Sequence, residues 1–155
     1  MNDHAQNDSH FKRELIAFRI ADQEFCVDIK SVREIRGYVP ATPLPKTPSY
    51  VAGVINLRGT VLPVMDLGLR MGLKAITPTP RSVIMVVKIG SQLFGLLVDA
   101  VSDIVSVTEE DIQVNPDVTN DRSRSFVSGL MALDQRMIAI IEASSILPEG
   151  LAEAA

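Results

Sequence analysis

Residues 53–66, GVINLRGTVLPVMD, carry the pattern that decides the fold of this chain. Two apolar arms flank Arg58-Gly59, and glycine at that place supplies the positive φ that a tight hairpin turn needs. The pattern therefore predicts a β-hairpin with a charged tip. Pro63 has no N–H to donate to a neighbouring strand, so we expect the returning arm to lie at a sheet edge or a bulge. A polar tip beside an incompletely paired strand favours docking over catalysis.

Further short strands are predicted on both sides of this hairpin. Residues 15–20 (LIAFRI) and 24–28 (EFCVD) are rich in β-branched and aromatic residues and form a first hairpin around a short turn. Strand character resumes at residues 82–88 (SVIMVVK). Short strands separated by turns at close spacing indicate an all-β chain.

Two short helical turns and one rigid connector are predicted between these strands. Ile29, Val32 and Ile35 recur at i, i+3 and i+6, which predicts one or two helical turns with an apolar face. Residues 67–73 (LGLRMGL) predict another single turn. The connector 36–48 has prolines at 40, 43, 45 and 48, which fix φ and remove backbone donors, so it is expected to be extended and stiff.

The second half of the chain repeats the first. The segment that begins at Ile20 (IADQEFCVDIKSVREI) aligns with the one at Ile89 (IGSQLFGLLVDAVSDI), and the hairpin from Gly53 aligns with the segment from Gly129 (GLMALDQRMIAIIEA). Duplicated sets of short strands predict two similar antiparallel barrels, whose closure removes most sheet edges. The apolar run 137–141 is expected to be buried on both faces, where the barrels pack together.

Composition limits the class of protein. With 155 residues and 46% hydrophobic side chains, the chain can form one domain with a core of ordinary size. The net charge of −4 and the absence of Trp argue against a nucleic-acid binder, which needs a basic face and stacking aromatics. A barrel that grips an oligonucleotide, as OB-folds do, remains as a remote alternative. No apolar run is long enough to span a bilayer.

The ends of the chain are predicted to lie outside the folded domain. Residues 1–14 form a polar leader that lacks the basic start and apolar centre of a signal peptide, and we expect it to be disordered. Residues 148–155 are expected to be a frayed tail. The single cysteine fits a reducing compartment, and the chain is predicted to be soluble and cytoplasmic.

The side chains capable of chemistry favour structural roles. His4 and His10 lie in the polar leader, away from any sheltered site. Cys26 lies inside an apolar strand with no adjacent base, which favours a buried, unreactive thiol. The run 108–111 (TEED) matches a helix N-terminal capping box better than a metal site. No glycine-rich loop for phosphates is present. We therefore expect no enzyme, no cofactor and no metal.

The two copies differ at their hairpin tips. The first tip, residues 56–59, has the sequence NLRG, whereas the second, residues 132–135, has ALDQ. Because both copies need the same core, the tips are where function can diverge. The residues alone leave open whether Glu34 and Arg58 are functional or are ordinary surface charges.

Four segments together resemble CheW, the coupling-protein family of bacterial chemotaxis: VREIRGY (32–38), TPSYVAGVINLRGTVLPVMDL (47–67), FGLLVDAVSDIVSV (94–107) and GLMALDQRMIAIIEASSIL (129–147). The resemblance covers about residues 15–147. It implies an all-β fold of two intertwined five-stranded SH3-like β-barrels with short helical turns. Residues 15–147 would be a single domain, with subdomains at roughly 15–82 and 83–147 that can exchange strands.

The resemblance also implies a function. CheW proteins are non-catalytic adaptors that couple methyl-accepting chemoreceptors to the histidine kinase CheA, whose regulatory domain has the same fold. The expected partners are this kinase and the cytoplasmic tips of receptors, with recruitment to membrane-associated arrays but no direct contact with membrane or nucleic acid. A CheW-like adaptor of another kinase-controlled pathway, such as surface motility, is the alternative.

The resemblance places four residues on a receptor-binding surface: Val32, Glu34, Arg58 and Ile104. We add Ile35 and Asn56 to the predicted surface. We expect Glu34 and Arg58 to lie close together as a charged rim. Val32, Ile35 and Ile104 would offer apolar contact to the helical hairpin of the receptor.

The kinase-binding surface is expected at the barrel ends and at the loop 113–118. Gly53, Gln113 and Val118 are its candidate residues. Gly53 has a second interpretation, because a glycine there can relieve a crowded strand, and Gly129 repeats it in the second copy.

Overall fold

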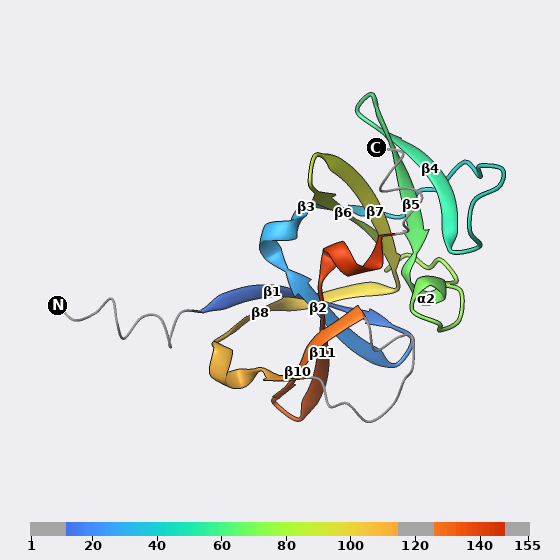
Figure 1. Cartoon of the computed structure of the whole chain (residues 1–155). Helices are drawn as coiled ribbons and strands as arrows, with labels where there is room; N and C mark the ends of the chain where they lie inside the picture. Colours follow the sequence, from blue (N-terminus) through green and yellow to red (C-terminus); the bar gives the residue numbers. More distant parts are fainter. Residues whose placement is uncertain (1–11, 115–125, 148–155) are drawn as a thin grey trace.

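The computed structural model describes residues 12–114 and 126–147. Two β-sheets pack against each other in this part of the chain, one in the upper and one in the lower part of Figure 1. The strands, in chain order, are β1 (Arg13–Ile20), β2 (Gln23–Asp28), β3 (Val32–Gly37), β4 (Val51–Leu57), β5 (Thr60–Asp66), β6 (Val83–Ile89), β7 (Gln92–Val98), β8 (Ala100–Val107), β9 (Gln113–Val114), β10 (Val127–Leu133) and β11 (Arg136–Ile141). The predicted all-β class is confirmed.

Each sheet takes strands from both halves of the chain. The five-stranded sheet has the order β3-β6-β7-β5-β4, and the six-stranded sheet has the order β8-β1-β2-β11-β10-β9. Thus β3 of the first half pairs with β6 of the second, and β8 pairs with β1. We call the two curved sheets the β4–β5 barrel and the β10–β11 barrel. A boundary between residues 82 and 83 does not separate them.

Two cores lie on opposite faces of β1. Ile16 and Phe18 belong to a large core that also includes residues of β4, β5, β6 and β7, whereas Leu15 and Ala17 point into a smaller core of the β10–β11 barrel. A strand that is buried on both faces needs a continuous apolar run, which explains the sequence LIAF.

The apolar run 137–141 differs from the prediction at its first residue. Ile138 and Ile140 are buried in the smaller core, and Ile141 is buried in the large one. Met137, however, is 63% exposed. Because side chains alternate along a strand, the residue before Ile138 points outward at this end of the barrel.

The hairpin that carries the fold-deciding sequence is confirmed. For Pro63, the predicted sheet edge is wrong, whereas a register shift of the β4–β5 ladder, in keeping with the predicted bulge, does lie beside it, between Val51 and Gly53. The edge strand is β4, and β5 lies inside the sheet between β4 and β7. Pro63 is tolerated there for two reasons. Its partner Val54 turns its own N–H and C=O away, toward Thr42, and β5 pairs with β7 only from Val64 onward. No hydrogen bond is therefore lost at the proline.

The predicted helical turns before β3 are largely wrong. Only Ile29–Ser31 forms a 3-10 turn (η1), and the chain then continues as β3, which pairs with β6. Pairing with β6 overrides the helical spacing of the apolar residues, and Val32 and Ile35 are β-branched residues that suit a strand. The later prediction is confirmed, because Leu67–Arg70 forms the short helix α2.

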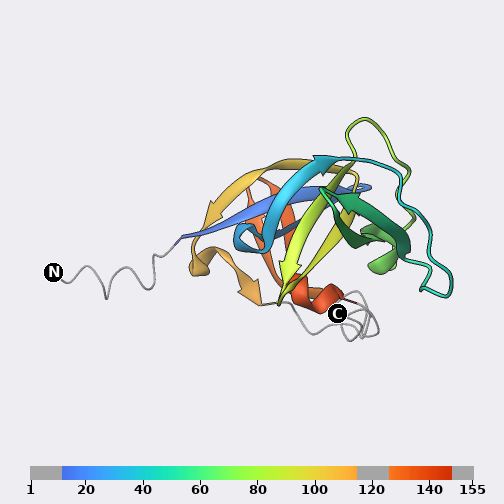
Figure 2. The ribbon, with the colours of Figure 1, turned by 90° about the horizontal axis from the view of Figure 1, so that it is seen from above.

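Helix α2 connects the two barrels through its last residue. The buried Asp66 caps α2 by accepting the N–H of Leu69 at 3.0 Å. Arg70 donates from Nε to the carbonyl of Ile146 at 2.8 Å, and its guanidinium lies 4.6 Å from the Tyr50 ring and 4.7 Å from the Phe126 ring. It thereby holds the C-terminal 3-10 turn η4 (Ala143–Ile146) against α2, and Figure 2 shows η4 from above.

Candidate functional site

The tip of the β4–β5 hairpin is a two-residue turn. Leu57 pairs with Thr60, so Arg58 and Gly59 form the turn, with φ values of 51° and 91°. Such a turn matches the twist of the two strands. Asn56 accepts the N–H of Gly59 at 2.8 Å through its side-chain oxygen. The asparagine therefore holds the turn that presents Arg58.

Arg58 forms an ion pair with Glu34, as the sequence analysis expected. The Nη2 of Arg58 donates to Oε1 of Glu34 at 2.6 Å, and the side chains are 71% and 29% exposed. This hydrogen bond lowers the pKa of Glu34 and raises the pKa of Arg58. Exposed pairs contribute little to stability. A partner can reach both groups.

The apolar residues of the predicted receptor surface are not all equally accessible. Ile35 is 41% exposed and lies on the opposite face of β3 from Glu34, because side chains alternate along a strand. Val32 is half-buried and packs against the large core. Ile104 is 57% exposed on β8, which belongs to the β10–β11 barrel. The structure thus brings Glu34, Asn56 and Arg58 together at one tip, with Ile35 on the opposite face of β3 and Ile104 on the other sheet.

Gly53 is a crowded backbone position. It is buried with φ of 145°, and a Cβ there would lie 2.2 Å from the carbonyl oxygen of Thr42. Thr42 belongs to the proline-rich connector and exchanges two backbone hydrogen bonds with Val54, at 2.8 and 2.9 Å. The connector, cyan in Figure 2, runs along the outer side of β4 and covers part of this edge. This geometry supports the packing interpretation of Gly53.

The remaining candidates for kinase binding are at the β10–β11 barrel. Gln113 is exposed in β9 and pairs with Leu130 of β10. Val118 lies outside the described residues. Gly129 is buried, and a Cβ there would lie 2.9 Å from a side-chain carbon of Ile112. Both copies therefore place a glycine where another segment crosses a strand closely.

The β10–β11 barrel carries a charged network that the sequence did not predict. Arg136 donates from Nε to Oε1 of Glu24 at 3.0 Å, and its Nη2 forms a second, short bond to Oε2. The guanidinium also bonds to Asp103, at 3.1 and 3.4 Å. Arg136 lowers the pKa of Glu24, and both carboxylates raise the pKa of Arg136. The alignment of Asp103 with Glu34 was the signal that could have found this network.

The polar groups with possible chemistry have structural roles. Cys26 has no exposed surface, and burial raises the pKa of its thiol to about 12. Thr108 donates its N–H to the Asp111 carboxylate at 2.8 Å, so the predicted capping box is confirmed at the 3-10 turn η2 (Glu109–Asp111). Within residues 12–114 and 126–147, no group of three or more His, Cys, Asp or Glu side chains could hold a metal ion. His4 and His10 lie outside these ranges.

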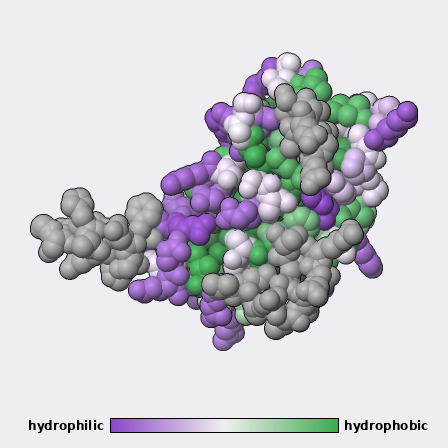
Figure 3. Space-filling view, in the orientation of Figure 1, coloured by the Kyte–Doolittle hydropathy of each residue, from purple (hydrophilic) through white to green (hydrophobic). Residues whose placement is uncertain are grey.

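The surface carries scattered apolar side chains among polar ones. The large hydrophobic residues exposed in the described part are Ile35, Tyr38, Leu44, Val61, Leu69, Ile104 and Met137. Figure 3 shows one face, on which hydrophilic residues gather near the start of β1 and apolar areas lie between them. No helix in the described ranges is long and apolar enough to cross a bilayer.

Comparison with known proteins agrees with this architecture. A family model described as a CheW-like domain matches residues 14–150. The chain is 57% identical over 143 residues to the chemotaxis protein CheW of Rhizobium meliloti, covering 92% of each chain. It is 56% identical to the probable chemotaxis protein CheW of Rhizobium etli over 143 residues, again covering 92% of each.

A solved structure has the same fold. The scaffolding protein TtCheW from Thermoanaerobacter tengcongensis superposes with a TM-score of 0.76 at 37% identity, covering 83% of this chain and 88% of that one. The predicted fold class, two intertwined SH3-like barrels, is confirmed by this similarity together with the two sheets. One detail differs, because the two-residue β9 adds a sixth strand to one sheet.

Proposed function

The chain belongs to the CheW family of chemotaxis scaffold proteins, and on that premise we propose that it couples methyl-accepting chemoreceptors to a CheA-type histidine kinase. It acts as a non-catalytic adaptor in the cytoplasm, recruited to membrane-associated receptor arrays. It needs no cofactor, nucleic acid or direct membrane contact. Family membership sets aside the oligonucleotide-binding alternative.

The observation that carries the proposal is the exposed Arg58–Glu34 pair at the β4–β5 tip. One nitrogen of Arg58 is used by Glu34, and 71% of the side chain faces solvent. Its remaining N–H groups suit carboxylate or carbonyl oxygens on a receptor helix. Ile35 and Val61, 41% and 64% exposed, supply apolar area on the same barrel. Such a combination suits a helix whose apolar face docks beside a polar rim.

An adaptor without catalysis transmits a signal only through differential binding. The receptor-bound chain must favour one kinase conformation over another, and each tenfold difference in affinity corresponds to about 1.4 kcal/mol. Two partners must therefore be held at once, on surfaces that do not exclude each other.

The experiment that tests receptor binding is a charge reversal at the tip. We expect Arg58→Glu to weaken binding to a cognate receptor signalling fragment by about tenfold or more in calorimetry, because it removes the donors and places a second carboxylate beside Glu34. Arg81→Glu is the matched control, since Arg81 is an exposed loop residue with the same charge change. Unchanged receptor binding by a folded Arg58→Glu protein would contradict the proposal.

A paired reversal separates contact from local structure. The double variant Glu34→Arg with Arg58→Glu restores an ion pair at the same place, with the positive and negative charges exchanged. If the receptor contacts these side chains, the double variant stays weak, whereas full recovery of binding would show that the pair only stabilises the tip.

The coupling itself is tested by reconstitution. The wild-type chain should make the activity of a cognate CheA-type kinase respond to a receptor fragment, and the kinase should not respond without it. If the chemotaxis kinase does not respond but the kinase of another pathway, such as surface motility, does, the chain is an adaptor of that other pathway.

A further inference from the structure

Arg36 is a second arginine beside the Arg58–Glu34 pair. The ladder between β3 and β6 is regular from Glu34 to Arg36, so these two side chains point to the same face of β3. The hydrogen bond from Arg58 lowers the pKa of Glu34, and the positive charge of Arg36 lowers it further. One carboxylate thus faces two guanidinium groups, which leaves a surplus positive charge beside the tip.

Part of the Arg36 guanidinium has no hydrogen-bond partner among residues 12–114 and 126–147. Glu34 accepts its hydrogen bond from Arg58, and the Nε of Arg36 is buried without a partner. Arg36 is paired across the ladder with Ile84, which is fully buried, so the stem of the arginine lies over apolar surface. A buried donor without a partner destabilises the folded chain. Stability of the fold therefore does not account for an arginine at this position.

The second copy of the repeat shows that the fold does not require this arginine. The alignment that matches Glu34 with Asp103 also matches Arg36 with Val105. Val105 is buried in the smaller core. An apolar, β-branched residue at this position therefore satisfies both the strand and the core. The arginine is a feature of the first barrel alone.

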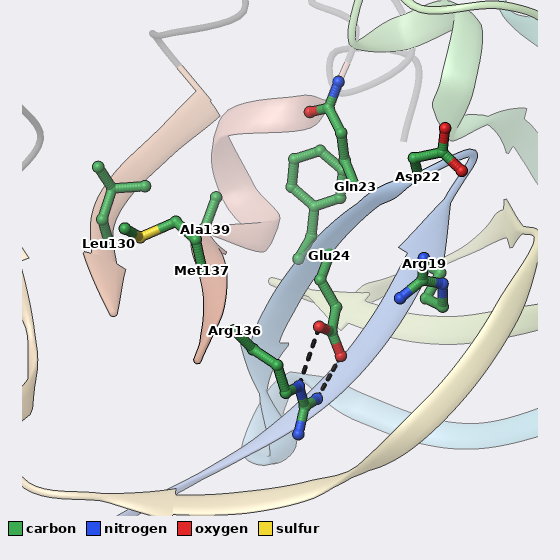
Figure 4. A pocket seen from close by; sticks show the side chains of 9 residues that line it. Arg19, Asp22, Gln23, Glu24, Leu130, Arg136, Met137 and Ala139 are labelled. Carbon is green, nitrogen blue, oxygen red and sulfur yellow. Dashed lines mark hydrogen bonds and ion pairs between the residues drawn. The ribbon is translucent and has the colours of Figure 1, made fainter. Parts of the chain in front are cut away.

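The charges of the two barrels are balanced differently. In the β10–β11 barrel, Arg136 is held by two carboxylates, those of Glu24 and Asp103. Figure 4 shows Glu24 and Arg136 pointing toward each other. That network satisfies its arginine within the protein. In the β4–β5 barrel the ratio is reversed, because one acid, Glu34, serves two arginines.

We propose that Arg36 is a further receptor-contact residue, and that it binds the carboxylate of an Asp or Glu on the helical hairpin of the receptor. This rests on the proposed function, in which that hairpin docks at the Arg58 tip. The surplus positive charge favours an acidic side chain, and a guanidinium can bind both oxygens of a carboxylate. Because the Arg36 guanidinium is already partly removed from solvent, docking costs it little further hydration.

The inference makes Arg36 a determinant of receptor choice. A hairpin with an acid opposite Arg36 satisfies the guanidinium. A hairpin with an apolar or basic side chain there leaves the charge without a partner in the interface, which lowers its affinity. Receptors that differ at this one position should therefore differ in their affinity for the chain.

The first test replaces the charge and keeps the stem. In the full chain, Arg36→Met should weaken binding to a cognate receptor signalling fragment by about tenfold in calorimetry. It should unfold at the same urea concentration as wild type or at a higher one, because an unsatisfied buried donor is removed. Arg36→Lys, which keeps the charge, should retain more affinity than Arg36→Met. Arg81→Met, the same change at an exposed loop arginine, should alter neither binding nor stability.

The second test identifies the acid. Single Asp→Asn and Glu→Gln substitutions are made along the receptor hairpin, and each fragment is bound to wild type and to Arg36→Met. For one fragment the tenfold difference between the two chains should disappear, because the contact is already lost on the receptor side.

Three outcomes would overturn the inference and leave the proposed function in place, provided that Arg58→Glu binds the receptor weakly. They are wild-type affinity in Arg36→Met, a joint loss of stability and binding in that variant, and a tenfold difference that persists with every neutralised receptor fragment. If the wild-type chain binds no receptor fragment, the proposed function fails and this inference fails with it.

Discussion

Replacing Gly53 with alanine is the substitution whose cost the structure defines best. A Cβ there would lie 2.2 Å from the carbonyl oxygen of Thr42, 2.5 Å from its carbonyl carbon and 2.9 Å from the nitrogen of Pro43. All three are backbone atoms, so no flexible side chain can move aside. The proline-rich connector must shift away from β4.

The cost has two parts. Alanine at a φ of 145° is strained by about 1–3 kcal/mol. Displacing the connector endangers the two hydrogen bonds between Thr42 and Val54, each worth about 1 kcal/mol. We therefore expect Gly53→Ala to lose about 4 kcal/mol of unfolding free energy, which corresponds to a fall in Tm of about 10 °C for a domain of this size.

Gly59→Ala is the matched control. Gly59 also has a positive φ, of 91°, but no atom lies within 4 Å of its Cβ position. It should lose only about 1 kcal/mol, or about 3 °C in Tm. Urea and thermal unfolding of both variants measure the difference. Equal stability of the two variants, with kinase binding lost only in Gly53→Ala, would refute the packing argument and restore Gly53 as a docking residue.

Three further predictions concern side chains whose contacts are internal. Arg70→Met should destabilise the chain by about 2 kcal/mol in urea unfolding, because the C-terminal turn loses its charged donor and two aromatic rings lose their cation. An unchanged free energy of unfolding would show that Arg70 does not hold this turn in place. Arg136 lowers the pKa of Glu24 below 4.5. The stability from this pair is therefore present above pH 4.5 and is lost as the pH falls through the lowered value. Arg136→Met should be less stable than wild type at neutral pH, and the gap should narrow in acid; a gap independent of pH would contradict this. Cys26 should react with a thiol reagent only as fast as the chain unfolds, since its thiol is buried with a pKa of about 12; complete labelling of the folded protein within minutes would show that the strand opens.

Local sequence determined the strands and turns because its signals act between near neighbours. The hairpin of residues 53–66 was predicted from two apolar arms and a glycine, and its tip lies at Arg58 and Gly59 as expected. The capping box at Thr108 depends on a residue three positions later. The duplication predicted two similar barrels because equivalent apolar patterns need equivalent cores.

Strand order and the exchange between halves were decided by tertiary pairing. β3 is a strand because β6 lies beside it, although the spacing of its apolar residues suits a helix equally well. Pro63 is compatible with an interior strand because its partner Val54 bonds to Thr42 on the other side and because β5 begins to pair with β7 only after it. Neither fact can be obtained from a window of neighbouring residues.

In the candidate site, too, the sequence determined one part and the tertiary structure the other. The sequence by itself determined which residues are unusual at the first hairpin tip, namely Asn56, Arg58 and Gly59. Only the tertiary structure decided which acids meet which arginines: Glu34 meets Arg58 across 24 positions, and Glu24 meets Arg136 across 112. The physical reason is that ion pairs act over a few ångströms in space. Barrel closure, which depends on long-range strand pairing, determines which charges come that close.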